Sequence, residues 1–291
     1  MSKHADPKTP KQPPAEADKK DIVNTQQRSL AVVDYGEDAG AGFQGQTKDE
    51  SALPFLGILQ PGSPEVLADE STVKAGTWVN RVTGEFYEGK KGIVVVGIVQ
   101  EHCYVEWKPK KGPNGEQLKG GFVARHERTE PVCQTAREKS PFKAFRMENG
   151  NDLVETFYVP ALVIDEESEY ETFAPVMLSF SSTHIKAYKN WSYIEKGIMV
   201  PKPGGGLQNP PFFGHKYRLT TLKKVDGGNT WFVPVIGFAG KDAESSRLVP
   251  GDLLYEAAKT LKKQFLAGEV KVDYKQTVSD NVQADGEKPP F

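Results

Sequence analysis

Apolar residues gather in short runs over most of the chain between residues 53 and 238, and polar stretches separate the runs. The runs are rich in β-branched and aromatic residues and are bounded by Gly, Pro, Asn or Asp, a pattern typical of strands. We therefore predict strands at residues 55–60, 77–82, 92–107, 122–125, 153–164, 176–181, 216–225 and 230–238.

Two connections between these runs have the composition of tight hairpin turns. Residues 82–85 read Val-Thr-Gly-Glu, and residues 226–229 read Asp-Gly-Gly-Asn. Glycine adopts the positive φ that such turns need. The second turn predicts a hairpin between residues 217–225 and 231–238.

Helical patterns are few. Thr183 is placed to cap a short helix that ends near Gly197, and within it the spacing of Tyr188 and Trp191 puts both on one face, which we expect to lie in the core. A longer helix is predicted to begin at Pro250 and to stop at Gly268. Its apolar stripe repeats every four residues, at Leu253, Ala257, Leu261 and Phe265.

The two ends of the chain differ from its middle. Residues 1–28 contain few apolar side chains, and apolar content falls again after Gly268. Such segments bury too little to offset the entropy of ordering. We therefore predict a disordered arm at residues 1–52, a β-rich globular domain at 53–268, and a disordered tail at 269–291. The expected fold class is mainly β, an antiparallel β-barrel of the oligonucleotide-binding (OB-like) kind or a sandwich, with two helices.

Composition indicates in which cellular compartment the protein is found. No apolar run approaches the roughly 18 residues of a membrane helix, and the N-terminus has no signal-peptide pattern. Only two cysteines are present, which is too few for a disulfide framework. We expect a cytoplasmic protein that does not associate with membranes.

The charge is nearly balanced. The net charge is -2, and residues 54–268 carry 27 Lys and Arg against 25 Asp and Glu. Dedicated nucleic-acid domains are often markedly basic, so this balance weighs against strong binding to a polyanion.

Enzyme signatures are scarce. Residues 203–206 read Pro-Gly-Gly-Gly without the Gly-Lys-Ser/Thr of a phosphate-binding loop, and no nucleophile elbow or metalloprotease motif occurs. Asp165, Glu166 and Glu167 could hold a divalent ion of a DNA-processing enzyme. Such a run is more typical of a solvated hairpin tip, and we expect a non-enzymatic protein without a cofactor.

Cysteine and histidine are the usual ligands of structural zinc, so this metal is considered first. Cys103 and Cys133 lack the partner two to four residues away that structural zinc sites usually show. His102 and Cys103 are adjacent and would point to opposite faces of a strand. Ordinary thiols and histidines are the favoured interpretation, and a metal at Cys103, Cys133 and His126 stays open.

Basic and aromatic residues interleave in three places: around residues 104–128, on the helix near residues 186–196, and at residues 212–224. A cationic groove with aromatic faces is how proteins hold single strands. The alternative is a half-buried sheet whose aromatics are core and whose cations are solvated. The candidate DNA-binding residues are Trp107, Lys108, Lys110, Lys111, Phe122, Arg125, Lys216 and Arg218, with Trp107 and Phe122 as the expected exposed platform.

The chain ends in Pro289, Pro290 and Phe291, after a polar tail with acidic residues. In this plan it resembles the single-stranded DNA-binding proteins of bacteria and phages, in which a β-barrel is followed by an acidic tail and a terminal Phe. The resemblance implies that the Phe ring fills an apolar pocket on a replication or recombination protein while its carboxylate pairs with a basic residue. Lys288 stands where that pattern has an acidic residue.

A broader resemblance covers residues 36–43, 53–60 and 212–231, which look like segments of a group of uncharacterised proteins encoded by tailed phages. It implies a phage protein made in the bacterial cytoplasm.

Three functions follow as hypotheses. The first is a protein that coats single-stranded DNA and recruits partners through its tail, either as a monomer or as a homo-oligomer. The second is a non-enzymatic phage protein that binds a host or virion protein. The third is a metal-dependent DNA-processing enzyme.

Overall fold

A computed structural model describes residues 52–68, 71–110, 112, 114–116, 118, 120–140, 144–167 and 172–274. The chain divides into two units, Met1–Ala39 and Gly40–Phe291, and all described residues belong to the second. The predicted arm at residues 1–52 and tail at 269–291 thus fall outside the described residues, apart from Ala52 and residues 269–274.

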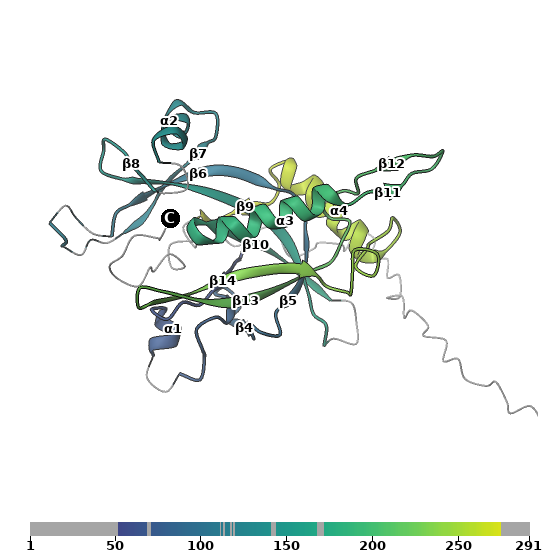
Figure 1. Cartoon of the computed structure of the whole chain (residues 1–291), viewed down its shortest axis with the longest axis horizontal. Coiled ribbons are helices and arrows are strands. Elements are labelled where there is room, and N and C mark those ends of the chain that lie inside the picture. Colours follow the sequence, from purple (N-terminus) through teal and green to yellow (C-terminus); the bar gives the residue numbers. More distant parts are fainter. Residues whose placement is uncertain are drawn as a thin grey trace, which may run out of the picture. The chain divides into compact units, whose positions relative to one another are not determined.

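Strands dominate the described residues, so the predicted mainly β class is confirmed. Eleven strands form one strongly curled sheet, a half-barrel (Figure 1). The described residues contain fifteen strands, and all except β1, β11, β12 and β15 belong to this sheet. The strands are β1 (Ala52–Leu53), β2 (Phe55–Ile58), β3 (Trp78–Asn80), β4 (Glu85–Tyr87), β5 (Ile93–Gly97), β6 (Glu101–Lys108), β7 (Gly121–Glu127), β8 (Phe145–Arg146), β9 (Asp152–Ile164), β10 (Phe173–Ser181), β11 (Val200–Pro201), β12 (Leu207–Gln208), β13 (Tyr217–Asp226), β14 (Asn229–Phe238) and β15 (Lys271–Val272).

The sheet is built around β9, which has 13 residues and pairs with β5, β6, β8 and β10. The main strand order is β14-β13-β5-β9-β10-β2-β3-β4, and β7 joins through β6. Most pairings are antiparallel, as expected. In the described part of the chain, β2 with β10 and β1 with β15 are parallel, so the all-antiparallel expectation is corrected there. Strand direction depends on how distant segments meet, and a period of two does not encode it.

Both predicted hairpins form. Gly84 ends the β3–β4 turn with a φ of 75°, and Gly227 and Gly228 have φ values of 54° and 86° between β13 and β14. Positive φ at both central residues matches the twist of the flanking strands, which explains why this turn could be predicted from its glycines.

Two helices are predicted, and the described residues contain four α-helices: α1 (Pro64–Leu67), α2 (Pro131–Lys139), α3 (Ile185–Gly197) and α4 (Leu253–Leu266). Helix α3 confirms the first prediction, but Thr183 lies inside a preceding 3₁₀ turn (Ser182–His184) rather than capping the helix. Helix α4 confirms the second with its core face shifted, because Leu254, Ala258 and Leu261 are buried while Leu253 is 44% exposed.

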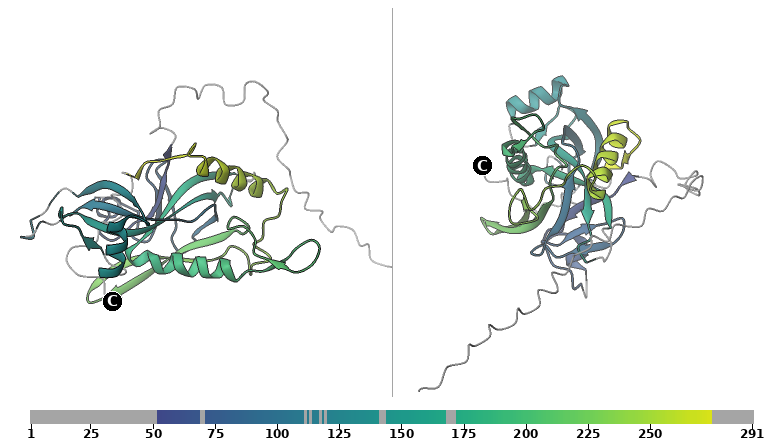
Figure 2. Two further views of the ribbon diagram at one scale, coloured as in Figure 1. Left: turned by 90° about the horizontal axis from the view of Figure 1, so that it is seen from above. Right: turned by 90° about the vertical axis from the view of Figure 1, so that its right-hand side faces the viewer.

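The sheet separates two apolar layers. Along β9, Phe157, Val159, Ala161 and Val163 face the concave side, where Tyr188 and Trp191 of α3 complete the core as predicted. Leu162 faces the other side and packs with Leu254 and Leu261 of α4. The two helices accordingly lie on opposite sides of the sheet (Figure 2).

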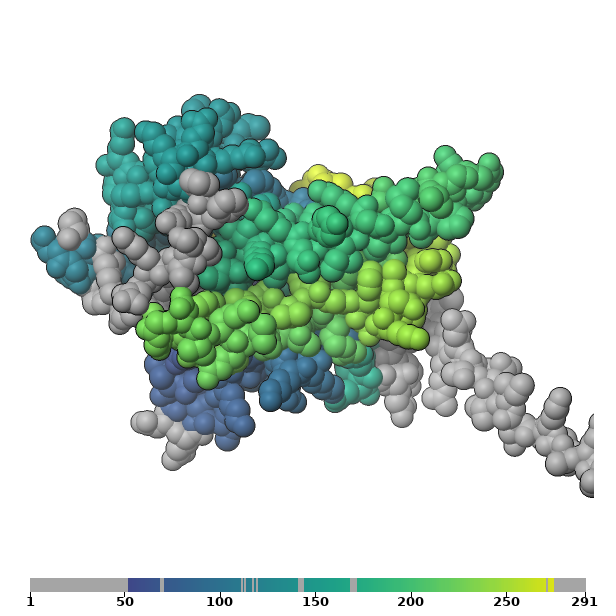
Figure 3. Space-filling view, viewed as in Figure 1, coloured from purple at the N-terminus to yellow at the C-terminus, as the bar shows by residue number. Residues whose placement is uncertain are grey.

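The curl nearly closes on itself. The Gln60 side chain, just after β2, donates to the Phe232 carbonyl of β14 at 3.1 Å and accepts from the Phe232 amide at 2.9 Å. His184 Nε2 also contacts that carbonyl, at 3.2 Å. Helix α3 packs along β14, and the two lie side by side on the face shown in Figure 3.

Within the part of the chain that is described, none of the helices has the length and apolarity that crossing a membrane requires.

Candidate nucleic-acid interface

A gap opens in the sheet where β10 and β2 separate. Met177 and Leu178 of β10 pair with Phe55 and Leu56 of β2, and beyond Leu178 the described partners of β10 are on β9 alone. The end of β10 thus has one strand edge facing the gap rather than a neighbour.

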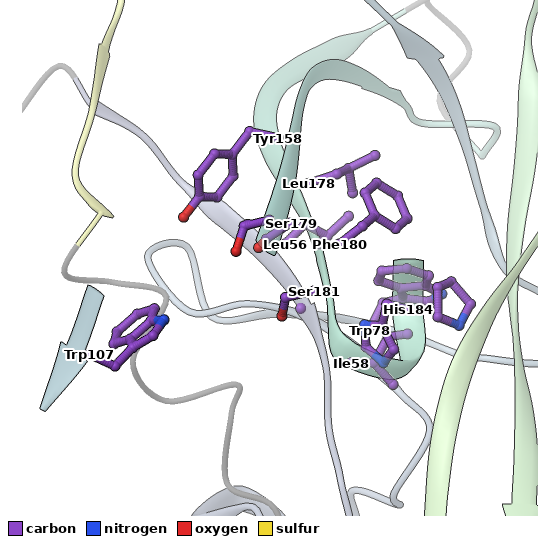
Figure 4. Close-up of a pocket in the computed structure, with 13 residues that line it drawn as sticks. Leu56, Ile58, Trp78, Trp107, Tyr158, Leu178, Ser179, Phe180, Ser181 and His184 are labelled. Carbon is purple, nitrogen blue, oxygen red and sulfur yellow. The ribbon is translucent and has the colours of Figure 1, made fainter. Parts of the chain in front are cut away.

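A pocket occupies this gap. Trp107 of β6 lies on one side, Trp78 and His184 lie on the other, and the hydroxyls of Ser179 and Ser181 stand between them (Figure 4). The space open to the centres of water-sized molecules is about 40 Å³, enough for a few waters. The complete lining is Leu56, Gly57, Ile58, Trp78, Trp107, Thr156, Tyr158, Leu178, Ser179, Phe180, Ser181, His184 and Pro234.

The pocket is lined by aromatic rings and hydroxyls, and carries no carboxylate or ammonium group. Burial lowers the pKa of His184 below its usual 6.5, which keeps the imidazole neutral at neutral pH. With a carbonyl as its partner, Nε2 must be the protonated nitrogen.

Two donors in this pocket lack acceptors. The indole nitrogens Nε1 of Trp78 and Trp107 are buried without a hydrogen-bond partner among the described residues. Trp78 itself is 3% exposed. Buried donors usually have a partner, which can be an ordered water. The indole nitrogens of Trp191 and Trp231 also lack a partner among the described residues, so this feature is shared by all four tryptophans and does not distinguish the pocket.

A β-bulge on β7 lies opposite Trp107. The pairing of β6 with β7 runs regularly to Glu106 opposite Ala124, then shifts so that Trp107 lies opposite Phe122. Val123 is the extra residue. The rings of Trp107 and Phe122 meet edge to face, with centroids 5.9 Å apart. Bulges of this kind re-aim side chains beside functional sites.

The structure places the predicted platform of Trp107 and Phe122 at the edge of an apolar cluster. Both side chains are half-buried, and Phe122 stacks on Tyr274 with centroids 6.0 Å apart. Both pack against the core cluster that contains Cys103 and Tyr158, and Trp107 lines the pocket whereas Phe122 does not.

Arg125 follows on β7 and is held by carboxylates. It pairs with Glu101 and, at 2.7 Å, with Glu127, and its guanidinium lies 6.0 Å from the centre of the Tyr274 ring. A guanidinium shared between two carboxylates has less charge to offer a phosphate.

The lysines of this region lie beside Trp107. Lys108 ends β6 and is exposed, and Lys110 begins the following loop and is exposed as well. Lys111 lies outside the described residues. The structure therefore brings Trp107, Lys108 and Lys110 together.

Lys216 and Arg218 belong elsewhere. Lys216 directly precedes β13 and Arg218 lies on it, and the strand order places β5 and β9 between β13 and β6. Arg218 donates to both oxygens of Glu166, at 2.7 and 2.8 Å. The eight predicted residues therefore do not form one continuous groove.

The acidic run is a hairpin connection, as expected. It joins β9 to β10, and residues 168–171 lie outside the described residues. Glu166 faces Arg218 and Glu167 faces Lys91, so these carboxylates are paired with cations rather than with one another. The Arg218 hydrogen bonds lower the pKa of Glu166 below its usual 4.5.

Cys103 and Cys133 are buried thiols in separate apolar clusters. Burial raises the pKa of Cys103 to about 12 and that of Cys133 to about 11, which keeps both protonated. Among the residues that the structure places, no three His, Cys, Asp or Glu side chains gather as a metal site.

Sequence reasoning missed most of the pocket. The sequence patterns identify Trp78, Tyr158, Ser179 and Ser181 only as strand residues. Their one local signal is the alternation of Ser179 and Ser181 with the buried Leu178 and Phe180, which puts hydroxyls on one face of a strand.

The fold and the site together define a class: a mainly β protein with a curled half-barrel sheet and an aromatic, hydroxyl-lined pocket at a gap between strands. A model of the Pam3 phage gp34-like protein family matches residues 23–271, and the chain belongs to this family. The expectation of a phage protein is thereby confirmed. No curated protein and no solved structure matches the chain.

Proposed function

We propose that this phage protein binds single-stranded DNA through the Trp107 pocket, with Lys108 and Lys110 beside it. The observation that carries the proposal is the half-buried Trp107 ring, which lines a pocket of aromatic faces and hydroxyls and is followed by the exposed Lys108. A nucleobase offers a flat face to stack on such a ring, which contributes about 1 to 3 kcal/mol per base. In this proposal the protein acts in the cytoplasm of the bacterial host.

Electrostatics limits the expected affinity. Lys108 and Lys110 are exposed beside Trp107, and we assign the phosphate contacts to them. Arg125 and Arg218 face carboxylates. The logarithm of the binding constant should therefore fall with the logarithm of salt at a slope of about -0.7 per contact, which is roughly -1 to -2 in total.

A fluorescence titration with oligo-dT at about 50 mM and about 200 mM salt tests the proposal. Trp107→Ala should weaken binding on the order of tenfold or more, because one stacked base is lost. Phe86→Ala is the matched control, since Phe86 is an aromatic residue 47% exposed on β4 away from the pocket.

Lysine contacts are tested in the same titration. Lys108→Ala should reduce the salt slope, whereas Lys224→Ala, which changes an exposed lysine on β13, should leave it unchanged. If the wild-type protein does not bind oligo-dT at the lower salt concentration, the proposal is wrong.

Partner recruitment is a separate part of the proposal. Pro289, Pro290 and Phe291 lie outside the described residues, and we propose that they dock on a replication or recombination protein. Deleting these three residues should abolish capture of the purified partner while DNA affinity is kept. A deletion that leaves partner capture intact would remove this role from the tail.

A second candidate is a protein that binds a host or virion protein without DNA. It is favoured by the near-neutral charge of residues 54–268 and by the cations already paired with carboxylates. An oligo-dT titration without binding, together with tail-dependent capture of a protein, would support it. Magnesium-dependent cleavage of the oligonucleotide would instead support a DNA-processing enzyme.

A further inference from the structure

The bulge opposite Trp107 lies directly against a buried acid. Glu106 precedes Trp107 on β6 at the point where the register shifts, and it is 5% exposed. Its side chain points to the face of the sheet opposite Trp107, because successive residues of a strand alternate. Hydrogen bonds that fix the Glu106 side chain therefore also restrain the backbone of the neighbouring Trp107.

Three donors hold the Glu106 carboxylate. Asn149 and Asn151 donate to Oε1 at 2.8 and 2.5 Å, and His126 Nε2 contacts Oε2 at 2.9 Å. The two asparagines come from the turn between β8 and β9, and His126 comes from β7. The acid thus ties three segments together around the bulge.

His126 is itself held between two acids. Its Nδ1 contacts Glu130 Oε2 at 2.9 Å, and Glu130 directly precedes α2. Glu130 Oε1 also accepts the Glu127 amide at 2.6 Å. Ionised carboxylates only accept hydrogen bonds, so both contacts are satisfied together only when both nitrogens of His126 carry protons.

We propose that Glu106, His126 and Glu130 form a proton-dependent clamp that fixes the β6–β7 bulge and so positions Trp107 at the pocket. His126 is in this sense a positioning residue. The effect of the clamp on DNA binding depends on the proposed function, whereas its effect on the position of Trp107 does not.

The directions in which the pKa values of His126 and Glu106 are shifted are consistent with the clamp. Burial alone would lower its pKa, but the hydrogen bonds to Glu130 and Glu106 outweigh burial and raise it above 6.5. Burial would raise the pKa of Glu106, but hydrogen bonds from Asn151, His126 and Asn149 bring it below 4.5. The clamp should be closed at pH values between the pKa of Glu106 and the pKa of His126, where Glu106 is ionised and His126 is protonated. It should open as the pH rises through the pKa of His126.

Burial raises the pKa of Tyr104 on β6 to about 12 and that of Cys133 on α2 to about 11, so neither loses its proton in this range. His102, the histidine on β6, faces Glu155 of β9 at 3.0 Å, and a variant in the test separates its contribution. The charged groups nearby are Glu127 at the end of β7, Arg128, Arg137 on α2, and the Arg146–Asp152 pair, which joins β8 to β9 at 2.9 Å.

The test follows the indole N–H resonance of Trp107 in the full-length ¹⁵N-labelled protein between about pH 5.5 and about pH 9, a range that spans the ordinary histidine pKa. Trp107→Phe assigns the resonance. In the wild type it should shift as the pH rises above the ordinary histidine pKa, and in His126→Gln it should not. His102→Gln is the matched control, because His102 pairs with Glu155 at 3.0 Å, away from the bulge, and should leave the titration unchanged.

A milder variant covers the case in which His126→Gln fails to fold. Glu130→Gln removes the more exposed of the two carboxylates, and it should move the midpoint of the Trp107 titration to lower pH. A midpoint unchanged by Glu130→Gln, or a Trp107 titration that persists in His126→Gln, overturns the clamp.

Oligo-dT affinity separates the two proposals. Wild-type and His102→Gln proteins should bind more weakly at about pH 8.5 than at about pH 6, where an ordinary histidine is mostly protonated, while His126→Gln should bind weakly at both. Titration of Trp107 without any DNA binding would refute the proposed function and leave the clamp standing. DNA binding with a Trp107 resonance indifferent to His126 would refute the clamp alone.

Discussion

Glu195 makes the stability of this protein depend on pH near neutrality. It lies on α3, is 7% exposed, and is accompanied by Trp191 and Tyr217, whose ring centroids are 5.3 Å apart. Burial raises the pKa of Glu195 from 4.5 to about 7, and the Tyr217 hydroxyl opposes part of that shift. The perturbation is Glu195→Gln, which keeps the shape of the side chain and removes the ionisation.

The magnitude follows from the shift. A rise from 4.5 to about 7 is about 2.5 pKa units, and at about 1.4 kcal/mol per unit the folded state loses about 3 kcal/mol when Glu195 ionises. Because the pKa is higher in the folded state, this stability is fully present below pH 4.5 and is lost as the pH rises to about 7. The variant should therefore gain on the wild type as the pH increases.

Urea unfolding of both proteins from about pH 5 to about pH 8, the two sides of that pKa, measures this difference. The two should be within about 1 kcal/mol at the lower pH, and Glu195→Gln should be the more stable by about 2 to 3 kcal/mol at the higher pH. Glu138→Gln, an exposed change on α2, is the control and should show no pH-dependent difference. A difference between wild type and Glu195→Gln that stays flat across this range would refute the reasoning.

Three further predictions concern the sheet and the thiols. Gln60→Ala removes both hydrogen bonds that join β2 to β14, so urea unfolding should show a loss of about 1 to 3 kcal/mol, and an unchanged midpoint would argue against this closure. Gly97→Ala would place a methyl group 2.7 Å from two aromatic rings and should cost about 1 to 3 kcal/mol, whereas Gly237→Ala meets nothing within 4 Å and should be nearly neutral. Cys103 and Cys133 should resist a thiol reagent near pH 8 in the folded protein and both react in urea, and rapid labelling of the folded protein would contradict their burial.

Local features account for the part of the fold that could be predicted. The glycines at residues 227 and 228 determine a hairpin because few other residues adopt positive φ, and the structure has the hairpin there. The buried face of α3 followed from the three-residue spacing of Tyr188 and Trp191. Helix α2 was missed, although Pro131 at its first position is a common start signal.

The ion pairs of the candidate site could not be predicted from local sequence patterns. Trp107 and Lys108 could be chosen from composition alone, but no local pattern indicates that Arg125 faces Glu101 or that Arg218 faces Glu166. Those pairs join residues 24 and 52 positions apart. They depend on strand order, which periodicity does not encode.

The sequence by itself determined the class of this protein: strands from β-branched runs, turns from glycines, and two helices from apolar spacing. Each of these rests on interactions within a few residues. The tertiary structure alone decided that β2 lies parallel to β10, that a gap follows Leu178, and that Trp78 and Trp107 line opposite sides of the pocket there. The physical reason is that a pocket depends on which distant segments bury their apolar faces together, and many arrangements of the same strands satisfy the local pattern equally well.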